Sequence, residues 1–229
     1  MDVSRVQWDD ARRIISTRHP PVDLFEDIAD PRDWELLISL EMKTNGRVMQ
    51  NVGRLDLVPV KRRVAGPGAS YVMAPFVYVS EDWSGRFHDG TFGAYYAAES
   101  FETALEEMRH HRAEIYRAAG DAPGWFSQFR ELIGSVDCAF HDLRGAAEHE
   151  AFLNPDDYSA SQRLARELRG DGSNGIVFPS VRRPGGECVA AFWPDVIGVP
   201  RTGRILSYHF DGERIDYVRD ETNNRILEF

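Results

Sequence analysis

The stretch from Ser100 to Arg117 constrains the fold most, because its apolar residues return at helical spacing behind a serine that can cap a helix. Residues three and four positions apart lie on one face of a helix, so the pattern predicts a helix over 101–117 with one face turned to a core. The residues of this stripe are Phe101, Ala104, Leu105, Met108, Arg112 and Ile115.

Two further helices are predicted on either side of this one. The first covers 30–42, where Asp30 can act as a cap and Asn45-Gly46 ends the pattern. Its apolar face consists of Trp34, Leu37, Ile38 and Met42. The second covers 158–169 and ends at Gly170. Its apolar face consists of Leu164, Ala165 and Leu168.

Several short apolar runs predict strands. Residues 71–79 follow a turn-rich loop at 65–70 and are predicted to form a strand that Pro75 bends or places at an edge. Residues 91–98 predict a strand that leads into the helix at 101–117. Periodicity does not decide whether 124–143 is a helix followed by a strand or a single long strand.

Two hairpins are predicted in the last third of the chain. Runs at 175–181 and 188–193 flank a Pro-Gly-Gly turn. Runs at 204–210 and 213–218 are joined by Asp211-Gly212, which favours a two-residue type I′ turn. Because strands and helices are mixed without regular βαβ alternation, the sequence predicts an α+β fold with largely antiparallel pairing.

Length and composition limit the remaining choices. The 229 residues fit one large domain, and 42% hydrophobic residues suffice for a sizeable core. A net charge of −10 argues against a surface that coats nucleic acid or binds an anionic membrane. With no leader or membrane-spanning run, we expect a cytoplasmic protein. The two cysteines, Cys138 and Cys188, lack metal-type spacing and are expected to be reduced, buried thiols of the core rather than a disulfide or redox pair.

Glu107 is the better candidate of two adjacent glutamates for a chemical role. At 100° per residue it lies at the rim of the apolar stripe, whereas Glu106 lies farther round and faces water. A carboxylate at such a rim can be partly desolvated and still reach a ligand. The alternative is that both glutamates are solvated helix charges paired with Arg109, Arg112 or His110.

Three other polar residues are candidates. Arg86 lies in a Gly-flanked loop, where a guanidinium can bind phosphate or carboxylate, or it is an ordinary surface arginine. Ser180 follows a hydrophobic strand without a GxSxG motif, so it presents a hydroxyl to a cleft or stabilises a turn. Tyr95 and Tyr96 point to opposite strand faces, so one packs in the core and the other offers a stacking surface.

Metal and nucleotide motifs are absent from the sequence. Glu107 and His111 have the i, i+4 spacing of metal ligands, with His110, His141 or His149 as a third, but no HExxH or paired-cysteine pattern supports a metal. Neither GxxxxGK[ST] nor GxGxxG after a strand occurs.

Three motifs together resemble the RES-domain family. They are Gly-Arg-Phe at 85–87, Tyr-Tyr-Ala-Ala-Glu-Ser-Phe-Glu-Thr-Ala-Leu-Glu-Glu at 95–107, and Gly-Ile-Val-Phe-Pro-Ser-Val at 175–181 continuing to Phe192. The resemblance implies a single RES-type domain over 1–229 with a fold similar to ADP-ribosyltransferases. A helical insertion at about 25–65 departs from the short form of the family, and the C-terminal hairpin is expected at about 204–218.

The resemblance also implies which residues form the active site. It carries the family's glutamate to Glu107, its tyrosine to Tyr96, its Gly-Arg arginine to Arg86 and its serine to Ser180. Its first arginine falls on Arg13 in Arg-Arg-Ile-Ile-Ser-Thr-Arg, with Arg18 and Arg63 as rivals.

Family members are typically NAD+-destroying toxins of bacterial toxin–antitoxin pairs, partnered with Xre-type antitoxins. The resemblance therefore implies cleavage of the nicotinamide–ribose bond of NAD+. It also implies a homodimer that assembles with an antitoxin. NAD+ would be the substrate, with no resident cofactor, and the acceptor stays open among water, inorganic phosphate and a protein side chain. The alternatives are a protein ADP-ribosyltransferase and a non-catalytic protein of the same fold that binds a nucleotide or a partner.

Overall fold

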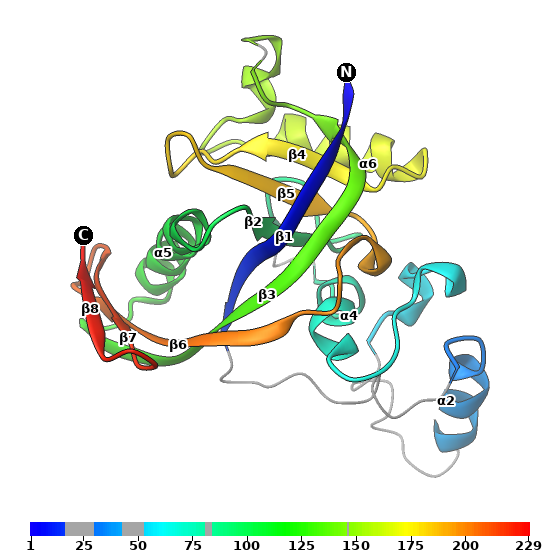
Figure 1. The fold of residues 1–229 in the computed structure, drawn as a ribbon, viewed down its shortest axis with the longest axis horizontal. Coiled ribbons are helices and arrows are strands. Elements are labelled where there is room, and N and C mark those ends of the chain that lie inside the picture. Colours follow the sequence, from blue (N-terminus) through cyan, green and yellow to red (C-terminus); the bar gives the residue numbers. More distant parts are fainter. Residues whose placement is uncertain (17–29, 43–52, 81–83, 146) are drawn as a thin grey trace.

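The chain forms one large mixed sheet that helices cover (Figure 1), in a computed structural model that describes residues 1–16, 30–42, 53–80, 84–145 and 147–229. The strands are β1 (Val3–Ser16), β2 (Tyr95–Ala98), β3 (Gly124–Asp142), β4 (Gly175–Pro179), β5 (Glu187–Ala191), β6 (Arg201–Phe210), β7 (Ile215–Asp220) and β8 (Arg225–Glu228). They follow the order β1-β2-β5-β4-β3-β6-β7-β8. Because β1 also pairs with β3, the first five strands of this order close into a ring, from which β6, β7 and β8 extend.

The structure describes four helices, of which the first lies apart from the sheet (Figure 1). They are α2 (Trp34–Met42), α4 (Ala69–Val77), α5 (Phe101–Ala119) and α6 (Ser159–Gly170), with short 3₁₀ turns at Leu55–Leu57, Val60–Arg62, Ala147–Phe152 and Pro194–Val196. The long helix α5 packs against β1, β2 and β7, whereas α6 packs against β4. The C-terminus ends beside α5 (Figure 1), where the Phe229 ring lies 3.5 Å from the Arg109 guanidinium.

Most of the predicted elements are confirmed. The Ser100 hydroxyl accepts a hydrogen bond from the Thr103 amide at 3.2 Å and so caps α5 as expected. Helix α6 and the β4–β5 hairpin also lie where the sequence predicts them. Seven of the eight strand pairings are antiparallel and only β3–β4 is parallel, so the α+β prediction with largely antiparallel pairing holds.

The undecided segment 124–143 is a single long strand, β3. It lies in the middle of the sheet, between β1 and β4 on one side and β6 on the other. Its central residues are buried on both faces from Glu131 to Gly134, so the alternation of exposed and buried residues at 135–140 does not extend through the whole strand.

The strand predicted at 71–79 is wrong, because these residues form helix α4. Its buried residues Val72, Met73, Phe76 and Val77 recur at helical spacing, which the apolar composition of the segment obscured. Pro75 lies inside this nine-residue helix, where its ring nitrogen cannot donate the backbone hydrogen bond to the Tyr71 carbonyl. The strand predicted at 91–98 is four residues shorter in the structure, because it consists of β2 (Tyr95–Ala98) alone.

The prediction of a two-residue type I′ turn at Asp211-Gly212 is also wrong. The β6–β7 connection has four residues, 211–214, and the Asp211 amide donates to the Arg214 carbonyl at 3.0 Å. The Asp211 carboxylate accepts from the amides of Glu213 and Arg214, at 2.8 Å each. A side chain that satisfies two turn amides favours this longer loop.

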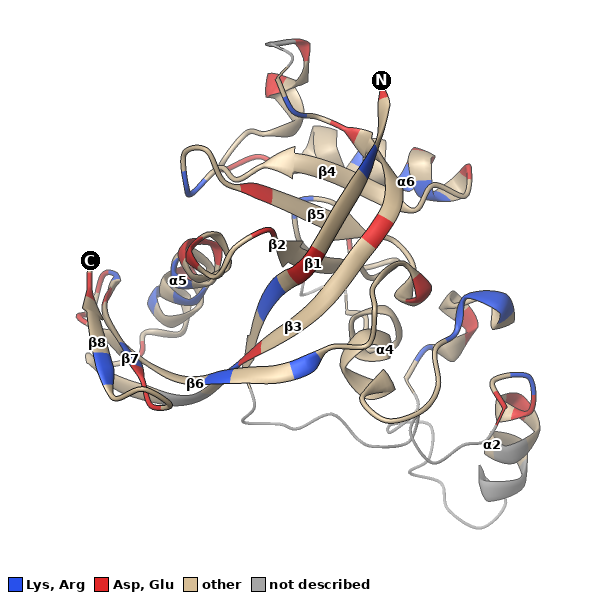
Figure 2. Cartoon of the chain, viewed as in Figure 1, with Lys and Arg blue, Asp and Glu red and all other residues tan. Residues whose placement is uncertain are grey.

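The stripe predicted on α5 faces two different surroundings. Its first turns are buried in the core through Phe101, Ala104 and Leu105. Farther along, Ala113 and Tyr116 are the buried residues, while Met108, Arg112 and Ile115 are only partly buried. Figure 2 shows that the same helix carries charges of both signs.

The predicted insertion at 25–65 is described only in part. Trp34 of α2 is fully buried, and Ile38 is partly buried. The side chains of Leu37 and Met42 and the expected helix end at Asn45-Gly46 lie outside the described residues. In the described parts of the chain, no helix is long and apolar enough to cross a membrane. Both cysteines are free thiols, and Cys188 is buried as expected, whereas Cys138 is only partly buried.

Candidate functional site

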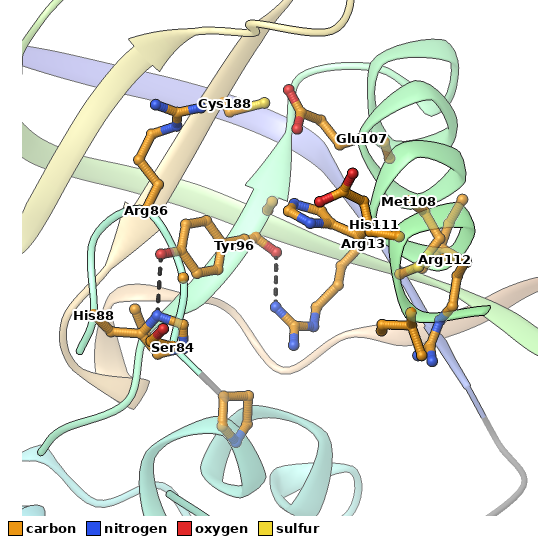
Figure 3. A pocket seen from close by; sticks show the side chains of 18 of the residues that line it. Arg13, Ser84, Arg86, His88, Tyr96, Glu107, Met108, His111, Arg112 and Cys188 are labelled. Atoms are coloured by element: carbon orange, nitrogen blue, oxygen red, sulfur yellow. Dashed lines mark hydrogen bonds between the residues drawn. The ribbon is translucent and has the colours of Figure 1, made fainter. Parts of the chain in front are cut away.

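A cavity of about 780 Å³ lies between α5, β1, β2 and the loop at 84–94 (Figure 3). This volume falls in the range of small-molecule sites, about 300–1,000 Å³. Three of the four residues predicted to be catalytic line it, namely Arg86, Tyr96 and Glu107. Ser180 lies directly behind Glu107.

Glu107 and Ser180, 73 positions apart, are joined by a short hydrogen bond. The Ser180 hydroxyl donates to Glu107 Oε1 at 2.6 Å. The Ser180 Oγ itself accepts from the amides of Arg182 and Arg183, at 3.2 and 3.0 Å. With both amides pointing at Oγ, the hydroxyl hydrogen is directed to the carboxylate. Ser180 therefore fixes Glu107 rather than lining the cavity.

Glu106 behaves differently from its neighbour. Its carboxylate accepts two hydrogen bonds from Arg109 Nη1, both at 2.8 Å, on the side of α5 that meets β7. Of the two neighbouring glutamates, only Glu107 lines the cavity. The reasoning that preferred Glu107 from its angle on the helix is consistent with this arrangement.

Arg86 is buried, with 8% of its surface exposed. Its Nη1 donates to the carbonyl of Asn154 at 2.5 Å, and its guanidinium lies 4.6 Å from the centre of the Tyr158 ring. Burial lowers the pKa of Arg86, while the charge of Glu107 raises it. The guanidinium is thus held rigidly beside Glu107, with N–H groups left for a ligand.

Tyr96 is fixed by the loop that carries Arg86. Its hydroxyl accepts from the Phe87 amide at 2.8 Å and lies 3.4 Å from His88 Nδ1 (Figure 3). Gly85 permits this close packing, because a Cβ there would lie 2.4 Å from His88 Cε1. Burial lowers the pKa of His88 to about 4, so its ring is neutral at pH 7.

Of the three N-terminal arginines predicted as alternatives, the structure brings Arg13 to the cavity. Its Nη1 donates to the backbone carbonyl of Tyr96 at 3.0 Å, and its guanidinium lies 4.5 Å from the Tyr95 ring centre. Tyr95 packs in the core, as expected for one of the tyrosine pair, and burial raises its pKa to about 12.

Arg63 does not line the cavity. Its side chain donates to the carbonyls of Val58 and Pro31 at 3.0 and 3.1 Å and to Glu35 Oε1 at 2.5 Å. It therefore connects the segment around residue 60 to α2. Arg18, the other alternative, lies outside the described residues.

Several lining residues were not singled out as site residues by the sequence. They are Arg12, His88, Arg112, Tyr158, Arg182 and Cys188. Arg112 left a signal, because an arginine within an apolar stripe indicates a face that does not simply pack in a core. Among the described residues, no three His, Cys, Asp or Glu side chains gather as metal ligands, although Glu107 and His111 both line the cavity.

Comparisons with known proteins identify related sequences. The family model described as "RES domain" matches residues 60–211. An uncharacterized protein, y4oC, of Sinorhizobium fredii (strain NBRC 101917 / NGR234) is 30% identical over 225 residues, covering 95% of this chain and 91% of its own. Among solved structures, the M. tuberculosis MbcT–MbcA toxin–antitoxin complex contains a chain with 13% identity and a TM-score of 0.44, covering 91% of this chain and 87% of that one.

Proposed function

Because the chain belongs to the RES-domain family, we propose that it is the toxin of a bacterial toxin–antitoxin pair and consumes NAD+ by cleaving the nicotinamide–ribose bond. The observation that carries the proposal is the short Ser180–Glu107 hydrogen bond at the wall of an arginine-lined cavity. A carboxylate that is held in one position next to cationic side chains fits a reaction in which positive charge develops on a bound anionic ligand.

Glu107 has the central role in this proposal. When the bond to nicotinamide breaks, positive charge develops at the anomeric carbon of the ribose, as in glycoside hydrolysis. A carboxylate held in place beforehand stabilises that charge without reorganising during the reaction. With Oε1 bonded to Ser180, Oε2 of Glu107 is the oxygen that faces the ribose and its hydroxyl groups.

The other residues would bind and orient the dinucleotide. Arg86 and Arg13 supply positive charge for its phosphates. Tyr96 offers its ring face to nicotinamide, since its hydroxyl is already bonded to the Phe87 amide. Water as acceptor would make the protein a glycohydrolase, and inorganic phosphate would make it a phosphorylase. No resident cofactor is needed for either reaction.

The proposal extends to fold family, partners and location. We propose that the chain has an ADP-ribosyltransferase-like fold and a cytoplasmic location. We also propose that it forms a homodimer in complex with an Xre-type antitoxin, which covers the cavity. These follow from the family resemblance. A net charge of −10 also leaves contact with an operator to the antitoxin rather than to this chain.

The test is a time course of purified protein with NAD+, with and without inorganic phosphate, that resolves nicotinamide, ADP-ribose and ADP-ribose 1-phosphate. We expect nicotinamide release, and expect Glu107→Gln to slow it at least about 100-fold, the scale of losing one electrostatic group in an active site. Glu106→Gln is the matched control, because it makes the same change one residue away, outside the cavity, and should keep the rate.

Two results would contradict the proposal. If Glu107→Gln folded normally and released nicotinamide as fast as the parent, Glu107 would have no catalytic role. If the parent left NAD+ intact on its own but modified a protein in a cell extract with ADP-ribose, the chain would be a protein ADP-ribosyltransferase instead.

A further inference from the structure

Hydrolysis of the nicotinamide–ribose bond needs a proton acceptor besides Glu107. When water bonds to the ribose carbon it gives up a proton, and a positioned side chain that accepts this proton speeds the step. Glu107 stabilises the positive charge at that carbon only while it stays ionised, and its Oε1 is already bonded to Ser180. The proton is therefore better taken by a second group in the cavity.

Few of the groups that line the cavity can take up a proton at neutral pH. Arginine and tyrosine side chains keep their protons there, and burial raises the pKa of the Cys188 thiol, so that it keeps its proton as well. Burial lowers the pKa of His88 to about 4, which makes its ring a weak base. The Glu114 carboxylate is bonded to Arg117 at 2.7 Å. Among the described lining residues, His111 is the base that remains.

His111 lies one helical turn beyond Glu107, on the face of α5 that lines the cavity. Residues at i and i+4 are neighbours on a helix, with Cβ atoms about 5–6 Å apart. Figure 3 shows both side chains reaching from α5 towards the same side. A ribose carbon held against Glu107 is thus also next to the His111 ring.

The ring nitrogens of His111 are free to bind a water molecule. The side chain is exposed, and its surface opens into the cavity. Its ring lies 5.7 Å from the ring of His110, and no residue in the described ranges forms a hydrogen bond or an ion pair with its nitrogens. The His141 ring, in contrast, is bonded to the Ser173 hydroxyl at 2.9 Å. An exposed imidazole without a protein partner bonds to water or to a ligand.

The surroundings of His111 favour its neutral form. Partial burial lowers its pKa below the ordinary value of ~6.5; Glu107 and Glu114 raise it, Arg182 and Arg86 lower it, and the net shift is downward. These charged groups come from α5 itself, from the loop at 84–94 and from the segment that follows β4. A neutral imidazole has one nitrogen that accepts a proton. The two carboxylates then stabilise the imidazolium that forms.

We propose that His111 is a catalytic residue that accepts the proton of the attacking water. The bond between ribose and nicotinamide breaks with its electron pair on the nicotinamide nitrogen, and the water oxygen bonds to the ribose carbon. The water proton passes to a ring nitrogen of His111 and from there to solvent. The inference rests on the proposed function and selects water as the acceptor, because a phosphate dianion loses no proton when it attacks.

The experiment compares hydrolysis with a reaction that needs no base. Nicotinamide and ADP-ribose are measured for the parent and for His111→Gln between about pH 5 and about pH 8. Each reaction is repeated with sodium azide, an anion that bonds to carbon without losing a proton. We expect His111→Gln to lower kcat for hydrolysis about 100-fold with KM almost unchanged. Azide should restore most of the nicotinamide release in the variant and yield the azide adduct of ADP-ribose.

The pH profile gives a second readout. The kcat of the parent should fall at acid pH, because His111 takes up a proton and can no longer accept one from water. His111→Gln should lack this fall. His110→Gln is the matched control, because it makes the same change at the adjacent residue, outside the cavity lining, and should keep both kcat and the profile. Thermal unfolding verifies that each variant is folded.

The outcomes separate this inference from the proposed function. If folded His111→Gln hydrolysed NAD+ as fast as the parent, or lost activity that azide did not restore, His111 would not be the base and NAD+ cleavage would stand. A flat pH profile of the parent would contradict the inference without any variant. A parent that releases nicotinamide only with inorganic phosphate would overturn it too, whereas a parent that releases none with either acceptor would contradict the proposed function itself.

Discussion

Replacing Ser180 with alanine tests whether Glu107 acts through its fixed position. The substitution removes the hydroxyl that donates to Glu107 Oε1 at 2.6 Å and leaves the rest of the cavity in place. It also removes the acceptor of the Arg182 and Arg183 amides. Ser180→Ala should therefore have two separable effects, one on the rate and one on stability.

The size of each effect follows from the bonds lost. A hydrogen bond to a charged group contributes about 1.5–3 kcal/mol. If that energy orients the carboxylate for the transition state, kcat falls about 10- to 150-fold, because ~1.4 kcal/mol is a factor of ten in rate. The two amides belong to partly exposed residues, so water replaces part of what they lose. A loss of about 1–2 kcal/mol corresponds to a Tm lower by about 2–8 °C in a chain of this size.

Ser207→Ala is the matched control. The Ser207 hydroxyl is also buried and also donates to a glutamate, Glu221 Oε1, at 2.8 Å, but it lies outside the cavity lining. Nicotinamide release and thermal unfolding are measured for both variants. We expect both to lower Tm and only Ser180→Ala to lower kcat. Equal kcat values for Ser180→Ala, Ser207→Ala and the parent would refute the positioning of Glu107 by Ser180.

Two further predictions concern stability. Burial holds the pKa of His88 at about 4 in the folded chain, below the ordinary value of ~6.5, so the unfolded chain takes up a proton first and the free energy of unfolding falls as the pH drops from about 6.5 to about 4. Denaturant unfolding at several pH values should show a shallower fall for His88→Gln, and an identical fall would contradict the buried neutral ring. Gly93→Ala should lower Tm strongly, because its Cβ would lie 1.8 Å from the Pro75 carbonyl oxygen. Gly170→Ala is the control and should keep Tm, because a Cβ at that position has no atom within 4 Å. Equal Tm values for the two variants in thermal unfolding would argue against the close approach of Gly93 to Pro75.

Local patterns in the sequence predicted those elements whose burial follows a simple period. Helix α5 and the β4–β5 hairpin are of this kind, because a cap or turn marks their ends and one face is consistently apolar. Strand β1 gave no such signal. Its charged residues are balanced by partners that only the fold brings close, such as Asp137 for Arg5 and Glu131 for Arg12. Ion pairs across more than 100 positions cannot be inferred from local spacing.

The candidate site was predictable to the extent that it depends on one helix. The angle around α5 separated Glu107 from Glu106, and the structure places only Glu107 at the cavity. The same arithmetic cannot distinguish a face that packs in a core from one that lines a cavity, which is why Met108 and Arg112 were assigned to the core stripe. The role of Ser180 as a partner of Glu107 depends on a contact between distant segments, which the periodicity of neither segment encodes.

The cavity itself results from how the strand ring closes. Strands β1 and β2 share a single pair, Arg12 with Ala98, whereas β2 pairs along its whole length with β5. Beyond that pair β1 and β2 diverge, and the backbone carbonyl of Tyr96, which lies on β2, accepts from the Arg13 guanidinium rather than from a strand amide. The Arg13 side chain thus connects the two strands where backbone hydrogen bonds between them are missing. The opening that separates the two strands is lined by Arg13 and Tyr96 and faces Glu107 on α5, so the irregular strand pairing creates both the space and the charge of the candidate site.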